Sequence, residues 1–274
     1  MDKPLTLGAV IYDPKVMVIW NIIREFLQSK GCPLDVSFYR TYELQVDALV
    51  DGGIEIAWNS PLAWVDCQRR TAGGCRAIAM RDTDCQRVSH LVVRRSTGIR
   101  ALQDLRGKTI GFGAKDSPQA TLIPIETLRR AGLEAARDYE ARRFDVQVGL
   151  HGDHVGGELD AFRALEAGTV AASVMLDLNW DRWTKDGTVD PGEFQVLAST
   201  DCFDHCNFTV LAGFPREREN RFLEALFAMT YEDPAHREMM DLEGLKAWLP
   251  GRTTGYAVLE AATRAQRFFV AAAP

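Results

Sequence analysis

Apolar residues alternate along the chain between short runs typical of buried strands and longer stretches with helical spacing. The run LTLGAVIY (5–12) predicts a strand, and VMVIWNIIREFLQSKG (16–31) has the apolar period of a helix that stops at a glycine. The same order repeats in PLDVSFY (33–39), YELQVDALVDGG (42–53) and IEIAWNSPLAWVDCQRR (54–70). Strands that alternate with helices favour an α/β fold with a parallel sheet covered by helices.

A second β-α-β series is expected in the middle of the chain. CRAIAMR (75–81) and HLVVRR (90–95) predict strands, and a short helix in 98–112 leads into another. The series then comprises a helix after Ser117, a strand at 145–149, a helix from about Glu158 to Ala167, a strand at 170–177 and a helix around Asn179 to Lys185. Strands at 194–200 and 207–213 are expected to return to the first series, and further helices form the C-terminal tail.

This order predicts two lobes, the second inserted into the first. Lobe one is expected to comprise residues 1–94 and 194–274, and lobe two residues 95–193, with two crossings of the chain between them. Each lobe is predicted to be a sheet flanked by helices. A cleft between two such lobes is the default site for a small ligand.

Composition and charge narrow the classes of function. Hydrophobic residues make up 46% of the 274 residues, and the net charge is −6. An acidic chain argues against nucleic acid or an anionic membrane as the main partner. No apolar run approaches the roughly 18 residues of a membrane span. No signal peptide is recognisable, which predicts a cytoplasmic protein; a periplasmic one is the alternative if a signal has been removed.

Two stretches hold residues that could bind a metal. DCFDHC contains Cys202, His205 and Cys206, but their spacing matches no common zinc pattern. LHGDHVGGELD places His151, Asp153 and His154 close together, and its glycines are equally explained by a tight loop at a strand end. The sequence therefore predicts no metal and no cofactor, and leaves the pairing of its six cysteines open.

The stretch GFGAKDSPQATLIPIETL (111–128) reads as a strand end, a loop and a helix start. Ser117 stands where an N-cap residue is expected, and Pro118 follows at the first helical position. Such a helix start suits an anion because its free N–H groups point forward. Here the next positions offer no further hydroxyl until Thr121.

Several segments together resemble the phosphate/phosphonate-type solute-binding family. They are DLRGKTIGFGAKDSPQATLIPIETLRRAGL (104–133), TYELQVDALVDGGIEIAWNSPLAW (41–64), GELDAFRALEAGTVAASVMLDLNWDRW (157–183) and FDHCNFTVLAGFP (203–215). The resemblance covers nearly the whole chain. It implies the two-lobed type 2 fold of periplasmic binding proteins, hinge closure on a small molecule and an ABC permease as partner.

The chain departs from the family at its ligand motif. The Ser-Thr-Ser-Gly run that binds phosphonate oxygens in the family corresponds here to Ser117, Pro118, Gln119 and Ala120, and a family histidine corresponds to Glu158. Two hydroxyls and one N–H are lost, and a carboxylate is gained. A simple phosphonate is therefore not the expected ligand.

The residues that remain at the predicted cleft suggest another ligand chemistry. From lobe one they are Tyr12, Tyr42, Asn59, Ser60 and Trp64, and from lobe two Ser117, Gln119, Glu158 and Asp177. Aromatic rings with carboxylates suit a cationic or zwitterionic molecule, and a carboxylate-bearing zwitterion would also use the helix start. The alternative for each aromatic residue is packing in the core.

An enzyme on the same fold is the second hypothesis, of a lyase, dehydratase or cofactor-biosynthesis type. Glu158 and Asp177 would then act as acid and base if burial raised the pKa of one of them. No nucleophile and base stand out together in the sequence, so solute binding is the preferred interpretation.

Overall fold

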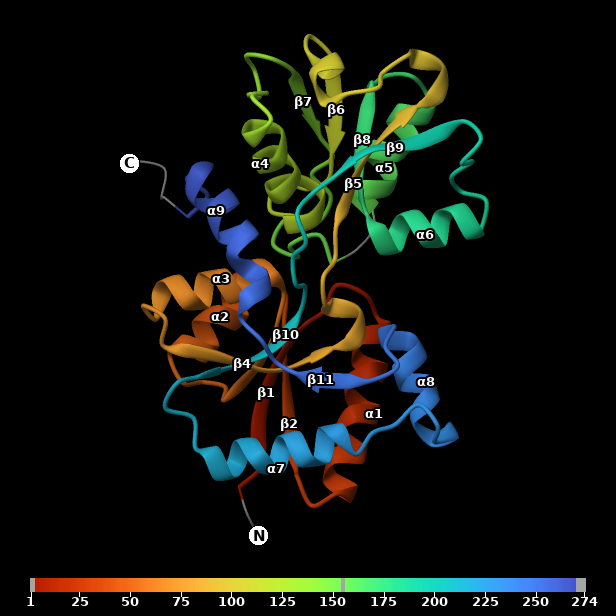
Figure 1. The fold of residues 1–274 in the computed structure, drawn as a ribbon. Helices are drawn as coiled ribbons and strands as arrows, with labels where there is room; N and C mark the ends of the chain where they lie inside the picture. Colours follow the sequence, from red (N-terminus) through yellow and green to blue (C-terminus); the bar gives the residue numbers. More distant parts are fainter. Residues whose placement is uncertain (1–2, 154–155, 270–274) are drawn as a thin grey trace. The chain divides into compact units, whose positions relative to one another are not determined.

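A computed structural model describes residues 3–153 and 156–269 of the chain. The chain divides into two compact units. The first unit contains the residues up to Cys85 together with Asp204–Tyr256, and the second contains Gln86–Phe203 together with the residues from Ala257 onward. In Figure 1 each unit is a sheet flanked by helices, which confirms the predicted α/β architecture.

The first unit is built on a six-stranded sheet with the order β11-β4-β10-β3-β1-β2. Its strands are β1 (Leu5–Val10), β2 (Leu34–Tyr39), β3 (Ile56–Asn59), β4 (Cys75–Arg81), β10 (Asn207–Leu211) and β11 (Trp248–Pro250). Its helices are α1 (Lys15–Ser29), α2 (Tyr42–Val50), α3 (Pro61–Arg70), α7 (Arg216–Phe227) and α8 (Pro234–Glu243), with 3-10 turns η1 (Asp82–Asp84) and η5 (Thr254–Tyr256). The apolar faces of α1, α7 and α8 share one core with the sheet, and α2 and α3 pack on its strands separately.

The second unit is built on a five-stranded sheet with the order β7-β6-β8-β5-β9. Its strands are β5 (Ser89–Arg94), β6 (Thr109–Phe112), β7 (Glu140–Arg143), β8 (Ala172–Leu176) and β9 (Phe194–Ser199). Its helices are α4 (Ile123–Arg130), α5 (Gly156–Glu166), α6 (Asp177–Lys185) and α9 (Ala257–Ala265), with the π-helical turn η4 (Pro118–Leu122) and the 3-10 turns η2 (Arg95–Thr97) and η3 (Leu102–Leu105). Alternate residues of β5 enter two different cores, one with α4 and one with α5 and α6, as expected for a strand buried on both faces.

The boundaries of the two units differ from the predicted ones. β5 pairs with β8 and β9, so 86–94 and 194–203 belong to the second unit and not to the first. The C-terminal helix α9 packs on α4, and Gln266 Nε2 donates a hydrogen bond of 2.8 Å to the Leu122 carbonyl. The chain therefore passes from one unit to the other three times, and not twice as predicted.

One predicted strand is wrong. Residues 145–149 form a loop, and the outer strand β7 lies earlier, at Glu140–Arg143. Gln147 and Gly149 have φ values of 51° and 96°, a conformation that a strand does not contain. None of the helices in the described part of the chain combines the length and apolar character needed to cross a bilayer.

Candidate functional site

The helix start after β6 has the predicted cap. Ser117 Oγ accepts a hydrogen bond of 3.1 Å from the Ala120 N–H, and Pro118 occupies the first helical position without a donor of its own. The Leu122 N–H reaches back to the Ser117 carbonyl at 3.0 Å, which makes the first turn a π turn. π turns recur at functional sites because they widen the helix locally.

A loop of the second unit packs directly against this helix start. A Cβ atom added to Gly152 would lie 2.3 Å from Ser117 Oγ, so the loop backbone is in contact with the cap. Gln119 Nε2 donates a 2.8 Å hydrogen bond to the Gly152 carbonyl. Ser117 and Gln119 are both buried. The structure thus brings these two predicted ligand residues together, with chain atoms packed against them.

The buried carboxylate of Asp116 accepts hydrogen bonds from the backbone of the same loop. Asp116 Oδ2 accepts hydrogen bonds from the Gly149 N–H at 2.6 Å and the His151 N–H at 3.4 Å. The side chain is buried. Asp116 is not among the predicted site residues, although a carboxylate immediately before an N-cap residue is a visible signal of local hydrogen bonding.

Glu158 and Asp177 differ in their contacts: Glu158 accepts hydrogen bonds, and Asp177 lies beside an arginine. Glu158 is buried, and its Oε2 accepts hydrogen bonds from the Leu176 N–H at 2.9 Å and from Asn179 Nδ2 at 2.8 Å. It therefore ties the start of α5 to the end of β8. Asp177 begins α6, and its Oδ2 lies 3.5 Å from Arg87 Nη1, with 18% of its side chain exposed.

The predicted polar residues of the first unit belong to a buried network. Asn59 Nδ2 donates to Thr209 Oγ1 at 3.0 Å, and Asn59 Oδ1 accepts from Gln45 Nε2 at 2.8 Å. Ser60 is the N-cap of α3, with its Oγ accepting from the Ala63 N–H at 3.1 Å. The Asn59 contacts join strands β3 and β10 to helix α2, and the Ser60 contact caps α3.

The predicted aromatic residues of the first unit are largely core residues. Tyr42 and Trp64 are each 1% exposed. The Trp64 ring lies 5.4 Å from that of Tyr256, and its indole N–H has no hydrogen-bond acceptor among the described residues. Tyr12 is half-buried and packs on the main core of this unit. An indole N–H that is buried without an acceptor is a donor that a ligand or a water molecule can satisfy.

The residues considered as metal ligands separate into two places. His151 is buried and Asp153 is half-buried in the loop of the second unit, while His154 lies outside the described residues. In the first unit, single ligand atoms of Asp84, His205 and Cys206 lie within 4.8 Å of one another. Of the DCFDHC motif, only two members take part.

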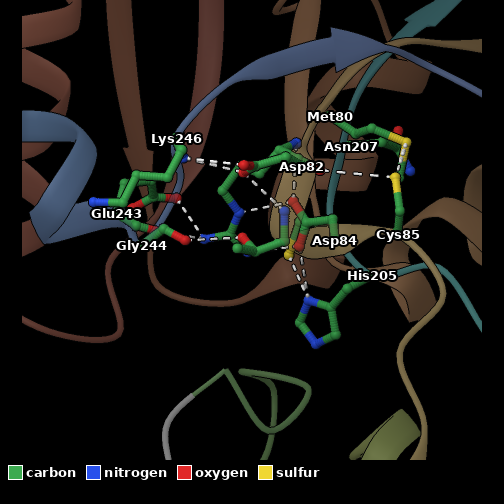
Figure 2. A network of polar contacts seen from close by, with 12 residues as sticks. Met80, Asp82, Asp84, Cys85, His205, Asn207, Glu243, Gly244 and Lys246 are labelled. Carbon is green, nitrogen blue, oxygen red and sulfur yellow. Dashed lines mark hydrogen bonds and ion pairs between the residues drawn. The ribbon is translucent and has the colours of Figure 1, made fainter. Parts of the chain in front are cut away.

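The Asp84 group is better described as an ion-pair network (Figure 2). Arg81 donates to both carboxylate oxygens of Asp84 at 2.7 Å and to Glu243 Oε1 at 3.0 Å. His205 Nδ1 lies 3.6 Å from Asp84 Oδ1 and 3.1 Å from Cys206 Sγ. Because a guanidinium already neutralises the carboxylate, these residues do not fit a cation site.

The two-sheet arrangement is shared with known binding proteins of low sequence identity. PhnD1 of Prochlorococcus marinus, in complex with methylphosphonate, superimposes with a TM-score of 0.70 at 16% identity over 97% of this chain and 98% of that one. A Xanthomonas citri protein bound to ATP superimposes with a TM-score of 0.74 at 17% identity, over 98% of this chain and 100% of that one. The periplasmic aliphatic sulphonate-binding protein of Escherichia coli superimposes with a TM-score of 0.63 at 13% identity, over 98% of this chain and 89% of that one. The fold is that of a periplasmic binding protein.

Residues 10–256 match the family described as ABC transporter, phosphonate, periplasmic substrate-binding protein. The chain belongs to this family, which confirms the predicted resemblance. A Haemophilus influenzae protein described as uncharacterized is 61% identical over 33 residues, which are 12% of this chain and 46% of that relative. The match thus spans about half the length of that relative.

Proposed function

We propose that this protein binds a small zwitterionic or cationic solute, and not an alkylphosphonate, for delivery to an ABC permease. The observation that carries the proposal is the small number of free hydrogen-bond donors at the helix start after Ser117. Its serine hydroxyl is used as a cap, Pro118 supplies no N–H, and Gly152 packs on the cap. A phosphonate dianion needs several donors, and this helix start offers few of them.

The charge of the surrounding residues supports the same conclusion. Asp116, Glu158 and Asp177 lie in the loops and helix starts that follow strands β6, β7 and β8, respectively. Carboxylates near a binding site repel an anion and attract a cation. Asp177 keeps part of its side chain exposed, so it is the carboxylate that we expect to face a positively charged group of the solute.

The hydrogen bonds of the carboxylates disfavour the enzyme hypothesis. Glu158 Oε2 already accepts from two donors, and Asp177 lies beside Arg87. Both carboxylates thus hold parts of the chain together, whereas a general acid or base has to contact the substrate.

Calorimetric titration tests the proposal directly. Methylphosphonate and 2-aminoethylphosphonate are expected to bind with Kd values no tighter than about 100 μM. A panel of amino acids, betaines and polyamines is titrated in parallel, and at least one class is expected to bind more tightly. Submicromolar binding of either phosphonate would contradict the proposal. Asp177→Asn serves as the matched variant and is expected to weaken binding of the preferred cation-bearing compound while leaving the Tm of the empty protein unchanged.

A further inference from the structure

Two buried oxygen atoms at the helix start of the second unit accept no hydrogen bond from the described part of the chain. Asp116 and Gln119 are each 2% exposed. Asp116 Oδ1 and Gln119 Oε1 are fully buried, and no donor among residues 3–153 and 156–269 reaches them. A buried acceptor without a donor is costly, so two of them close together in the sequence call for a donor beyond the described residues, and a bound ligand can supply it.

The orientation of the Gln119 amide is fixed by its neighbour. Gln119 Nε2 donates to the Gly152 carbonyl at 2.8 Å. Turning the amide over would place Oε1 against that carbonyl, which cannot donate. The unpaired atom is therefore an acceptor, and it adds to the acceptor character that Asp116 gives to this position.

The donors that would suit an anion at this place are already used by Asp116. Gly149 and His151 have φ values of 96° and 53°, and their N–H groups both point to Asp116 Oδ2. Successive N–H groups of a chain in such conformations form a concave anion site. Here the carboxylate of the chain itself occupies it, so an anionic ligand would meet both the occupied donors and the charge.

We propose that Asp116 is a specificity-determining residue, which excludes anionic groups from this helix start and, with Gln119, favours a hydrogen-bond-donating cation such as an ammonium group. This inference rests on the proposed function and adds the residue that enforces it. Asp116→Asn keeps the shape and an acceptor for Gly149 and His151 but removes the charge. This substitution is therefore expected to let an anion bind more tightly while the loop keeps its hydrogen bonds.

The experiment is a titration of wild type and Asp116→Asn with methylphosphonate. The variant is expected to bind at least about ten-fold more tightly than wild type, because a like charge no longer opposes the ligand. Asp145→Asn is the matched control: Asp145 Oδ1 also accepts from a loop N–H, that of Lys115 at 2.7 Å, but Asp145 is exposed, so solvent screens its charge. Its effect on affinity is expected to stay within about two-fold.

The outcomes separate the two proposals. Weak binding by wild type and equally weak binding by Asp116→Asn would overturn the role of Asp116 and leave the proposed function standing. Tight binding by wild type would overturn both. A second measurement needs no variant: at 10 mM, about the concentration that weak binding requires, 2-aminoethylphosphonate is expected to raise the Tm of wild type more than methylphosphonate does. Equal shifts or the reverse order would contradict the preference for an ammonium group.

Discussion

Two hydrogen bonds of 2.7 Å join the guanidinium of Arg81 to the buried carboxylate of Asp84. Burial alone would raise the pKa of Asp84, but the charge and hydrogen bonds of Arg81 outweigh it and lower the pKa to about 2. Arg81 also reaches Glu243, which lies on the last turn of α8. A single side chain thus joins β4, the turn after it and a helix far along the chain.

Asp84→Asn is expected to lower the free energy of unfolding by about 3 kcal/mol at pH 7, because it leaves a buried guanidinium without its main partner. The pKa of Asp84 is depressed in the folded state, so its contribution of about 2 kcal/mol is complete above pH 4 and is lost as the pH falls toward 2. Urea unfolding at pH 7 and pH 2.5 measures both effects.

The control for this prediction is Asp47→Asn. Asp47 pairs with Arg70 at 2.7 Å, but its side chain is 53% exposed, so its loss is expected to change the unfolding free energy by less than about 1 kcal/mol. If wild type and Asp84→Asn differed in unfolding free energy by the same amount at both pH values, the carboxylate would not stabilise the fold through its charge.

Ser117→Ala removes the cap of η4 and is expected to lower the free energy of unfolding by about 1 kcal/mol. Ser60→Ala is the comparison in the first unit, where the same cap lies at the same 3.1 Å distance. Chemical denaturation of both variants is the measurement. If Ser117→Ala raised stability while Ser60→Ala lowered it, the Ser117 hydroxyl would be strained toward another partner and not a simple cap.

Local chemistry made some of these residues predictable. Both serine caps follow from a hydroxyl placed before a proline at a helix start, a signal contained in a few neighbouring residues. The Asp84 network had no such signal, because Glu243 and His205 are brought to it only by the tertiary fold. Asn59 looked like a ligand residue for the same reason: its partner Thr209 is distant in sequence.

The loop at 145–153 shows how tertiary contacts override a local pattern. Alternation in DVQVG predicted a strand, yet the segment adopts left-handed conformations at Gln147, Gly149, His151 and Gly152. The loop is held in that form by hydrogen bonds that it donates to Asp116 and accepts from Gln119, two residues that lie about thirty positions earlier. Such conformations are unfavourable for non-glycine residues and persist only when the surroundings fix them.

Gly152→Ala is expected to destabilise the protein by more than a left-handed alanine alone would, because the added Cβ would lie 2.3 Å from Ser117 Oγ and 2.7 Å from Ser117 Cβ. The conformational cost is about 1 kcal/mol, and the clash adds about 1–3 kcal/mol. Gly187→Ala is the matched control, since Gly187 has φ 82° and nothing within 4 Å of the added atom. Urea unfolding measures the loss of unfolding free energy in both variants. Equal losses would show that the loop is not in steric contact with the helix start.

The sequence predicted two α/β units, but it did not place their boundaries correctly. Strands β5 and β9 have the composition of strands and carry no signal of which sheet they enter. Their antiparallel pairing, with Val92 opposite Val196, decides their membership. Family resemblance supplied the class of protein, whereas the unit to which the C-terminal helix belongs depends on contacts with α4 that no sequence pattern records.

A chain that ends at Tyr256 tests which unit needs the C-terminal segment. Helix α9 buries Leu259 and Ala262, and Gln266 caps the Leu122 carbonyl of the second unit. Burial of one leucine side chain contributes about 1.5–3 kcal/mol, so the loss is expected to loosen α4 and η4. Hydrogen exchange measured by mass spectrometry should show faster exchange in residues 118–130 of the truncated chain, while residues 5–10 and 34–39 of the first sheet stay protected. Gln266→Ala in the full-length chain is the control, with a smaller effect confined to the end of η4. Loss of protection in the first sheet, with α4 unchanged, would assign α9 to the first unit and contradict the division of the chain.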